Sequence, residues 1–196
     1  LAGEGVRAVS TPEAVRGPAV VTSAHGVSPE TLVALNARGL EIVDTTCPYV
    51  RRAQKAARKM ARAGFYVVVY GDAEHPEVKG ILGWAGGGIA TLDTAFLRKM
   101  EPLPRRIGVV SQTTQVPQAF QGFIHRLIDL AFGQDSEVWC VDTICHDIRQ
   151  RQAAALELAG RVDLMLVVGG QSSANTRHLA ALCGDAAATH HITDAA

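Results

Sequence analysis

The chain has 196 residues, of which 47% are hydrophobic and 19% are charged, and its formal net charge at pH 7 is zero. This composition is typical of a globular protein with a core of its own. The zero net charge argues against a nucleic-acid-binding protein. The apolar runs of five or six residues fall far short of the ~20 that span a bilayer. We therefore expect a cytoplasmic protein that contacts neither nucleic acid nor membrane.

The predicted elements alternate between short apolar strands and amphipathic helices. Strands are expected at 7–11, 20–23, 65–69, 89–93, 108–111, 138–141, 164–168 and 191–194, and helices after Ser28, over 49–63 and over 147–159. In the second helix, Val50, Ala53, Ala57 and Met60 follow a helical spacing. Strands that alternate with helices indicate an α/β fold with mainly parallel strands.

The chain contains an internal repeat displaced by 98 positions. Asp44-Thr45-Thr46-Cys47-Pro48 and Asp142-Thr143-Ile144-Cys145-His146 each precede a predicted helix and strand, and a glycine lies 24 residues after each cysteine. Polar residues continue the match, with a third correspondence between 20–25 and 108–113. The resulting pairs are His75 with Ser173, Glu77 with Asn175, and His25 with Thr113. Such a repeat indicates equivalent structural modules.

The repeat divides the chain into one whole module and two partial ones. Residues 1–47 form the back half of a first module, 48–141 a complete second module, and 142–196 the front half of a third. We expect the chain to be a fragment of three modules. On the same logic, the missing front half would begin with another cysteine.

Four cysteines, at positions 47, 140, 145 and 183, are too few for a disulfide scaffold and contain no Cys-x-x-Cys pair. Cys140 and Cys183 lie in apolar runs, so we expect buried structural thiols there. Cys47 and Cys145 each head a helix, where the positive end of the helix dipole favours the thiolate. One such cysteine would be read as a core thiol, but two in matching Asp-Thr-x-Cys contexts indicate a ligand or redox role.

Polar loops follow the predicted strand ends, where open parallel sheets bind ligands. A histidine beside the free backbone N–H groups of a helix start, as at His25, suits a phosphate. Each loop residue alone is typical of a turn or a cap, but matching module positions would point them at one centre. These candidates are His25, His75, Glu77, Thr113, Ser173 and Asn175. Asp44 and Asp142 are interpreted as turn or cap residues.

The helix after Cys47 is strongly basic and carries no acidic residue. Its cations are Arg51, Arg52, Lys55, Arg58, Lys59 and Arg62. Such a run indicates either a solvated face or a docking surface for an acidic partner, such as an electron-carrier protein of the ferredoxin or flavodoxin type.

Six motifs along the chain resemble those of the 4-hydroxy-3-methylbut-2-enyl diphosphate reductase (LytB) family, in the same order. They are Ala24-His25-Gly26-Val27-Ser28, Asp44-Thr45-Thr46-Cys47-Pro48, His75-Pro76-Glu77-Val78, Gln112-Thr113-Thr114, Asp142-Thr143-Ile144-Cys145 and Ser172-Ser173-Ala174-Asn175. The resemblance implies a pseudo-threefold trefoil of α/β modules around a central iron–sulfur cluster. It also implies a reductive dehydration that yields isopentenyl and dimethylallyl diphosphates.

The resemblance implies roles for individual residues. Cys47 and Cys145 resemble two of the three thiolates that hold a [4Fe-4S] cluster, whose remaining iron is open to substrate. The diphosphate-binding residues of the family correspond to His25, His75, Ser173 and Asn175. Glu77 resembles the proton donor, and Thr113 resembles the hydroxyl that organises the substrate alcohol and the proton relay.

The chain departs from the family pattern in three ways. The family's first cluster cysteine and first diphosphate histidine lie upstream of Leu1, its last substrate-binding serine lies beyond Ala196, and Ala174 replaces a second serine. We therefore expect weak or absent activity from the 196 residues alone.

Two other interpretations stay open at this point. One is a non-catalytic α/β fragment or pseudo-enzyme that binds a phosphate-like ligand without iron. The other is a zinc hydrolase with the metal among Cys47, Cys145, His25 and His75, although no pair has the short spacing of a metal finger.

Overall fold

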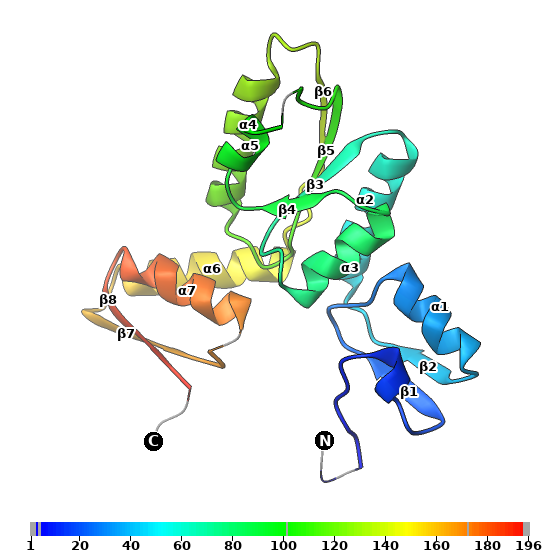
Figure 1. The fold of residues 1–196 in the computed structure, drawn as a ribbon. Coiled ribbons are helices and arrows are strands. Elements are labelled where there is room, and N and C mark those ends of the chain that lie inside the picture. Colours follow the sequence, from blue (N-terminus) through cyan, green and yellow to red (C-terminus); the bar gives the residue numbers. More distant parts are fainter. Residues whose placement is uncertain (1–2, 4, 101, 172, 194–196) are drawn as a thin grey trace.

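The computed structural model describes residues 3, 5–100, 102–171 and 173–193, with the backbone alone at residue 97. It has three lobes, each built on a parallel β-sheet. The two outer lobes lie below the central one in the view of Figure 1. The central sheet has four strands in the order β4-β3-β5-β6, and each outer sheet has two, β1-β2 and β7-β8. The predicted α/β fold with parallel strands is confirmed.

The first lobe, in blue in Figure 1, contains η2 (Pro12–Ala14), β1 (Ala19–Thr22), α1 (Pro29–Ala37) and β2 (Glu41–Asp44). The strand predicted at 7–11 is wrong, since these residues have no regular strand structure. A strand forms by pairing, and in the central lobe the corresponding strand pairs with β3. The described part of the first lobe offers 7–11 no equivalent of β3.

The central lobe contains the complete α/β unit. Its elements are α2 (Pro48–Arg62), β3 (Tyr66–Tyr70), α3 (Pro76–Ala85), β4 (Ile89–Thr91), α4 (Ala95–Arg98), β5 (Arg106–Ser111), α5 (Pro117–Ala131) and β6 (Glu137–Cys140). Alternate residues of β3 point to opposite faces of the sheet, so Val68 packs in the cluster with α5 and Val67 in the cluster with α2 and α3. Burial on both faces explains why this strand is an unbroken apolar run.

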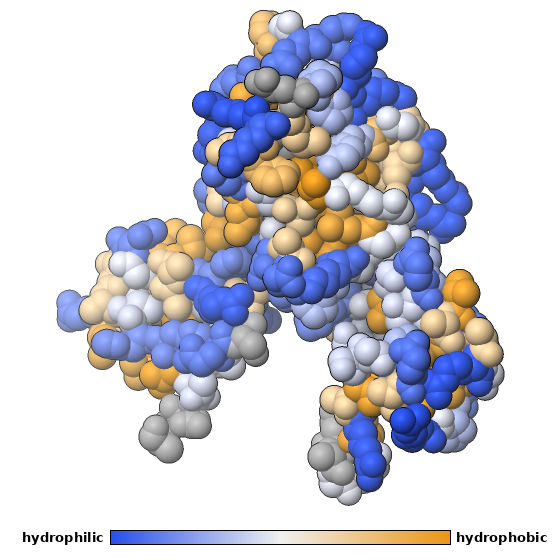
Figure 2. Space-filling model, viewed as in Figure 1, coloured by the Kyte–Doolittle hydropathy of each residue, from blue (hydrophilic) through white to orange (hydrophobic). Residues whose placement is uncertain are grey.

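The third lobe contains α6 (His146–Ala159), β7 (Leu164–Val168), α7 (Ala174–Gly184) and β8 (Ala188–Ile192). Apolar side chains remain at the surface of both outer lobes (Figure 2). Val21 of β1 is 60% exposed, and Leu166 and Val168 of β7 are 57% and 63% exposed. The outer lobes therefore bury less of their apolar sequence than the central lobe does. The division of the chain after residues 47 and 141 stays a prediction.

The internal repeat extends to the hydrogen bonds, but one predicted register is wrong by a single residue. The Thr45 hydroxyl donates to the Thr22 carbonyl, and the equivalent Thr143 hydroxyl donates to the Ser111 carbonyl. These bonds pair Thr22 with Ser111, so His25 corresponds to Thr114 and not to Thr113. Apolar strands resemble one another at any offset, whereas the hydroxyl bond fixes the register.

Two further expectations concern burial. Cys183 is buried as predicted, but Cys140 is exposed because it lies at the end of β6, an edge strand of the central sheet. Among the described residues, no helix is both long and apolar enough to cross a membrane.

Candidate active site

Cys47 and Cys145 occupy equivalent positions at the starts of two helices. Cys47 is the N-cap residue of α2 and Cys145 that of α6, and neither side chain accepts a capping hydrogen bond. Their backbone N–H groups are fixed instead, because Cys47 donates to the Ala24 carbonyl at 3.0 Å and Cys145 to the Thr113 carbonyl at 2.9 Å. Both thiols are free to bind another group, and all four cysteines of the chain are free.

Tyr49, on the first turn of α2, lies near charged groups at the starts of both α2 and α6. The charge of Asp147 raises the pKa of the Tyr49 phenol most strongly, and burial, Cys145 and Cys47 raise it further. The loops that hold the two cysteines also meet, because His25 follows Ala24 and packs on His75, and Thr113 bonds to Glu77. The fold therefore brings together two cysteines that are 98 residues apart in sequence.

The aspartates before the cysteines build the turns that aim them, as expected. One oxygen of Asp44 accepts from the Thr46 N–H at 2.9 Å and from the Thr46 hydroxyl at 2.5 Å, and the other pairs with Arg51 at 2.9 Å. The Thr46 bonds lower the pKa of Asp44. Asp142 repeats the pattern by accepting from the Ile144 N–H at 3.1 Å. The other oxygen of Asp142 forms an ion pair with Arg149.

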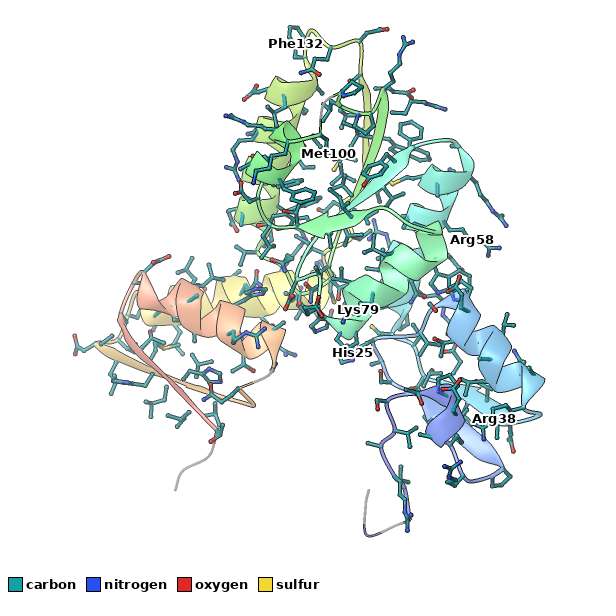
Figure 3. All side chains as sticks on the ribbon, in the orientation of Figure 1. His25, Arg38, Arg58, Lys79, Met100 and Phe132 are labelled. Atoms are coloured by element: carbon teal, nitrogen blue, oxygen red, sulfur yellow. The ribbon has the colours of Figure 1, made fainter. Side chains whose placement is uncertain are left out.

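His25 and His75 come from different lobes and pack edge to face, with ring centroids 5.1 Å apart. In Figure 3, His25 lies below the first turn of α3 near Lys79, where the three lobes meet. His75 is the N-cap residue of α3, and its Nδ1 accepts from the Glu77 N–H at 3.2 Å. Its proton therefore sits on Nε2 in the neutral ring. Burial, and then His25, lower the pKa of His75, so the neutral form is favoured.

Glu77 and Thr113 form a buried pair at the ends of α3 and β5. The Thr113 N–H donates to Oε1 of Glu77 at 2.6 Å, and the Thr113 hydroxyl donates to Oε2 at 3.0 Å. Glu77 is only 2% exposed. Burial raises its pKa above the ordinary value of glutamate, and the two bonds from Thr113 oppose that rise in part. The carboxyl group holds a proton to higher pH than an exposed glutamate does.

The start of α7 presents polar groups of the third lobe. Ser173 is its N-cap residue and accepts from the Thr176 N–H at 3.3 Å. The side-chain oxygens of Asn175 and Thr114 are buried without a hydrogen-bond partner among the described residues. The His178 ring of α7 bonds to the Thr114 carbonyl at 2.7 Å, which places α7 beside the loop after β5. Unsatisfied buried oxygens of this kind are suited to a polar ligand.

A comparison with protein-family models matches residues 1–196 to the LytB protein family. The chain belongs to the LytB family. It is 58% identical over its whole length to "4-hydroxy-3-methylbut-2-enyl diphosphate reductase" of a Dehalococcoides mccartyi strain, covering 69% of that protein. The protein of the same name from Pelobacter propionicus is 38% identical over 98% of this chain and 68% of its own length.

Two solved structures are similar to this LytB chain. One, described as "Structure of (E)-4-Hydroxy-3-methyl-but-2-enyl Diphosphate Reductase, the Terminal Enzyme of the Non-Mevalonate Pathway", has 34% identity and a TM-score of 0.61. The match covers 89% of this chain and 62% of that one. The other, from Plasmodium falciparum, has 23% identity and a TM-score of 0.81 over 89% of this chain and 55% of its own, and it supports the fold alone. The predicted trefoil-like fold is thus confirmed.

Sequence reasoning missed several residues around the LytB site. Gln112 is fully buried, and its Oε1 accepts from the Asp72 N–H at 3.1 Å, which ties the loop after β5 to the loop after β3. His178 bonds to the Thr114 carbonyl, although no motif marks it. The one sequence signal for a role of Gln112 was its position directly before Thr113 in a recognised motif. The site roles of the recognised residues themselves stay predictions.

Proposed function

We propose that the chain contributes most of the active site of a 4-hydroxy-3-methylbut-2-enyl diphosphate reductase. The reaction consumes two electrons and two protons, removes the C4 hydroxyl as water, and gives isopentenyl or dimethylallyl diphosphate. The buried Glu77–Thr113 pair carries the proposal, because a carboxyl group that retains its proton is what a reductive dehydration needs next to its substrate. Family membership supports it.

The diphosphate would bind between the histidines and the start of α7. His75 offers the N–H of Nε2, because its Nδ1 is already occupied as a helix cap. His25 packs against it and is exposed, so both rings can contact one anion. Ser173 adds a hydroxyl at the N-terminus of α7, where backbone N–H groups favour negative charge. The free Oδ1 of Asn175 can accept a hydrogen bond from the substrate hydroxyl.

Protons would pass through Glu77 and Thr113. Burial keeps Glu77 protonated to higher pH, and the Thr113 hydroxyl on Oε2 is placed to relay that proton toward a substrate oxygen. The Thr113 N–H on Oε1 holds the carboxyl group in one orientation as its charge changes. The buried position also excludes bulk water, which limits loss of the proton to solvent.

Cys47 and Cys145 would hold two irons of a [4Fe-4S] cluster. Their fit to this role rests on free thiols at two helix N-termini. No cluster of three or more metal-binding side chains occurs in the part of the chain that the structure describes, so a third ligand would come from outside it. When bound, such a cluster supplies electrons and a Lewis-acidic iron.

The basic face of α2 would receive the electron donor, an acidic protein of the ferredoxin or flavodoxin type. Among its six cations, only Arg51 forms an ion pair within the described residues. Arg58 stacks on Trp84, and a cavity of about 220 Å³ beside them is lined by Lys55 and Thr46. Thr46 precedes Cys47, so a donor docked here would lie near the cluster ligand. Free thiols throughout the chain are consistent with a cytoplasmic enzyme.

The deciding experiment is anaerobic reconstitution of the chain with iron and sulfide. Iron and sulfide would be counted per polypeptide and the absorption spectrum recorded, for the wild type, Cys47→Ser, Cys145→Ser and Cys140→Ser. We expect a cubane spectrum that both site variants lose and that Cys140→Ser retains, since Cys140 is the last residue of β6 and does not head a helix. A folded wild-type chain without iron and sulfide would withdraw the claim that these residues bind a cluster.

A turnover assay separates the reductase from a phosphate-binding domain without catalysis. The cluster-loaded protein would be given the allylic diphosphate and a chemical one-electron reductant, and the C5 diphosphate products would be measured. The reductase needs the acid of Glu77, so Glu77→Gln would lower turnover about 10²-fold or more while it leaves binding of inorganic diphosphate intact. Equal turnover by wild type and Glu77→Gln would show that Glu77 is not the proton donor.

A further inference from the structure

The loops after β1 and β5 are equivalent in the repeat, yet the structure anchors them differently. The first carries His25 and Gly26, and the second carries Thr114 and Gln115, according to the register that Thr22 and Ser111 define. Each loop packs against two helices, α2 and α3 in one case and α6 and α7 in the other. The anchoring side chains come from equivalent positions of these helices.

The loop after β5 is held by two hydrogen bonds from the third lobe. The His178 ring lies on α7 and donates from Nδ1 to the Thr114 carbonyl at 2.7 Å. Gln152, on α6 and 5% exposed, donates from Nε2 to the Gln115 carbonyl at 3.4 Å. Both acceptors follow directly on Thr113 in the chain. Neither His178 nor Gln152 belongs to a motif of the proposed reductase site.

The loop after β1 lacks both bonds. The residue 98 positions before Gln152 is Gln54, whose Nε2 is buried against Gly26 without a hydrogen-bond partner among the described residues. The residue 98 positions before His178 is Gly80, which has no side chain to donate. A Cβ atom at Gly80 would lie 3.8 Å from the His25 carbonyl, at ordinary contact distance. Two equivalent loops of the same chain thus differ: the loop after β5 is held by side-chain hydrogen bonds from two helices, and the loop after β1 is not.

We infer that His178 and Gln152 are positioning residues that clamp the loop after β5 and thereby hold Thr113 on Glu77. The inference rests on the proposed function for its catalytic meaning. The N–H and the hydroxyl of Thr113 donate to Glu77, and its carbonyl accepts from the Cys145 N–H. A shift of the Thr113 backbone therefore changes three hydrogen bonds at once. The clamp links the third lobe to the proton-donating pair of the central lobe. His25, on the unclamped loop, remains able to adjust to a bound anion.

The first test needs no activity. Amide hydrogen exchange of Thr113 would be measured in the chain and in His178→Leu, His178→Asn and Gln54→Leu. Leucine removes the N–H donor, and asparagine places an amide N–H close to the position of Nδ1. We expect exchange at Thr113 to rise about five- to tenfold in His178→Leu, the factor that corresponds to one lost hydrogen bond. Exchange in His178→Asn and Gln54→Leu should remain within about twofold of the wild type.

Unchanged exchange in His178→Leu would overturn the clamp, and so would equal acceleration in His178→Asn. Gln152→Leu provides the same measurement at the second bond if His178→Leu does not fold, with Gln54→Leu as its matched control. These readings stand whether or not the chain turns over a substrate.

The second test asks whether the clamp serves catalysis. In cluster-loaded protein, His178→Leu should lower kcat about tenfold or more and leave KM for the allylic diphosphate within about twofold, because the diphosphate residues lie on other loops. His178→Asn should restore kcat. A rise in KM with unchanged kcat would overturn the assignment. Wild-type turnover that does not depend on Glu77 would reject the proposed function, and the exchange result would still decide the clamp.

Discussion

Thr113 places both of its donors on the two oxygens of Glu77, its N–H on Oε1 at 2.6 Å and its hydroxyl on Oε2 at 3.0 Å. The carboxyl group is 2% exposed and contacts no cation in the described ion pairs. Burial favours its neutral form and the Thr113 bonds favour its charged form. A group in this balance can give up a proton and recover it without a large rearrangement.

Replacement of Glu77 by glutamine should change how stability depends on pH. Because the pKa of Glu77 is raised on folding, the native state binds more protons than the unfolded state above the ordinary glutamate value of 4.5. Its contribution to stability is therefore complete at low pH and declines as pH rises through the folded-state pKa. Urea unfolding between pH 4 and pH 8 should show a smaller decline in Glu77→Gln. Turnover should fall about 10²-fold or more.

Glu74→Gln is the matched control for that prediction. Glu74 lies three residues away, its side chain is 86% exposed, and its partner Lys79 is 57% exposed. The pH dependence of its unfolding should follow the wild type. If Glu77→Gln and the wild type declined in parallel, the buried carboxyl group would not be the source of the pH dependence.

The hydroxyl of Thr113 can be tested apart from its N–H. Thr113→Val keeps the shape and the backbone bond to Oε1 but removes the donor to Oε2, so we expect a loss of about 1–3 kcal/mol in the free energy of unfolding. Thr113→Ser should retain most of the stability. Turnover should drop in the valine variant and recover in the serine variant. Equal stability of the valine variant and wild type at neutral pH would show that the hydroxyl bond contributes nothing.

His75 should titrate below the ordinary histidine value. Burial is the main cause of its lowered pKa, and protonation would also end the bond in which Nδ1 accepts the Glu77 N–H. Nitrogen NMR of the chain at pH 7 should show a neutral ring with hydrogen on Nε2, and the titration midpoint should lie below 6.5. A midpoint above that value, or hydrogen on Nδ1, would contradict the capping geometry. Inorganic diphosphate should perturb Nε2 first.

The repeat of the cysteine motifs predicted the helix starts and the pairing of two distant thiols, because an N-cap is a local feature. The loops after β1 and β5 were harder to align, and the predicted match of His25 with Thr113 was wrong by one residue. Short valine-rich strands carry no internal landmark, and the offset is fixed by the bonds of Thr45 and Thr143 and by those of the Cys47 and Cys145 N–H groups.

Contacts between lobes were beyond prediction for a different reason. His178 of the third lobe reaches Thr114 of the central lobe across 64 positions, and Gln152 reaches the Gln115 carbonyl across 37. Neither side chain differs in type or spacing from ordinary polar residues of a helix or loop. Such contacts depend on how three separately folded sheets meet, which periodicity does not encode. Burial of Cys140 was likewise mispredicted, because an edge strand reads like a central one in sequence.

The two aspartate turns should differ in strength although their sequences match. Asp44 accepts from the Thr46 N–H, the Thr46 hydroxyl and the Thr22 hydroxyl, whereas Asp142 accepts from a single backbone N–H besides its arginine. We expect Asp44→Ala to cost about 1–2 kcal/mol and Asp142→Ala less than about 1 kcal/mol in urea unfolding at pH 7.

The pH dependence of these two variants provides a second reading. The pKa of Asp44 is lowered, chiefly by the bonds from Thr46, so its contribution is present above 3.8 and is lost as pH falls through the folded-state value. The difference between wild type and Asp44→Ala should therefore shrink in acid. A larger cost for Asp142→Ala would show that the arginine ion pairs, and not the threonine bonds, hold the turns.

The cations of α2 should control the rate of electron delivery and not the chemistry that follows it. Reversing Arg52 and Lys55 to glutamate places repulsion on the helix that Cys47 caps, and we expect electron transfer from an acidic donor protein to slow about tenfold or more at low salt. The wild-type rate should itself fall as ionic strength rises. Arg161→Glu is the matched control, because Arg161 lies beyond the end of α6 and its side chain is 74% exposed. Turnover with a small chemical reductant should stay constant in all of these variants, because such a reductant needs no docking surface. If the protein-driven rate were also unchanged, the basic face of α2 would be a solvated surface and the donor would bind elsewhere.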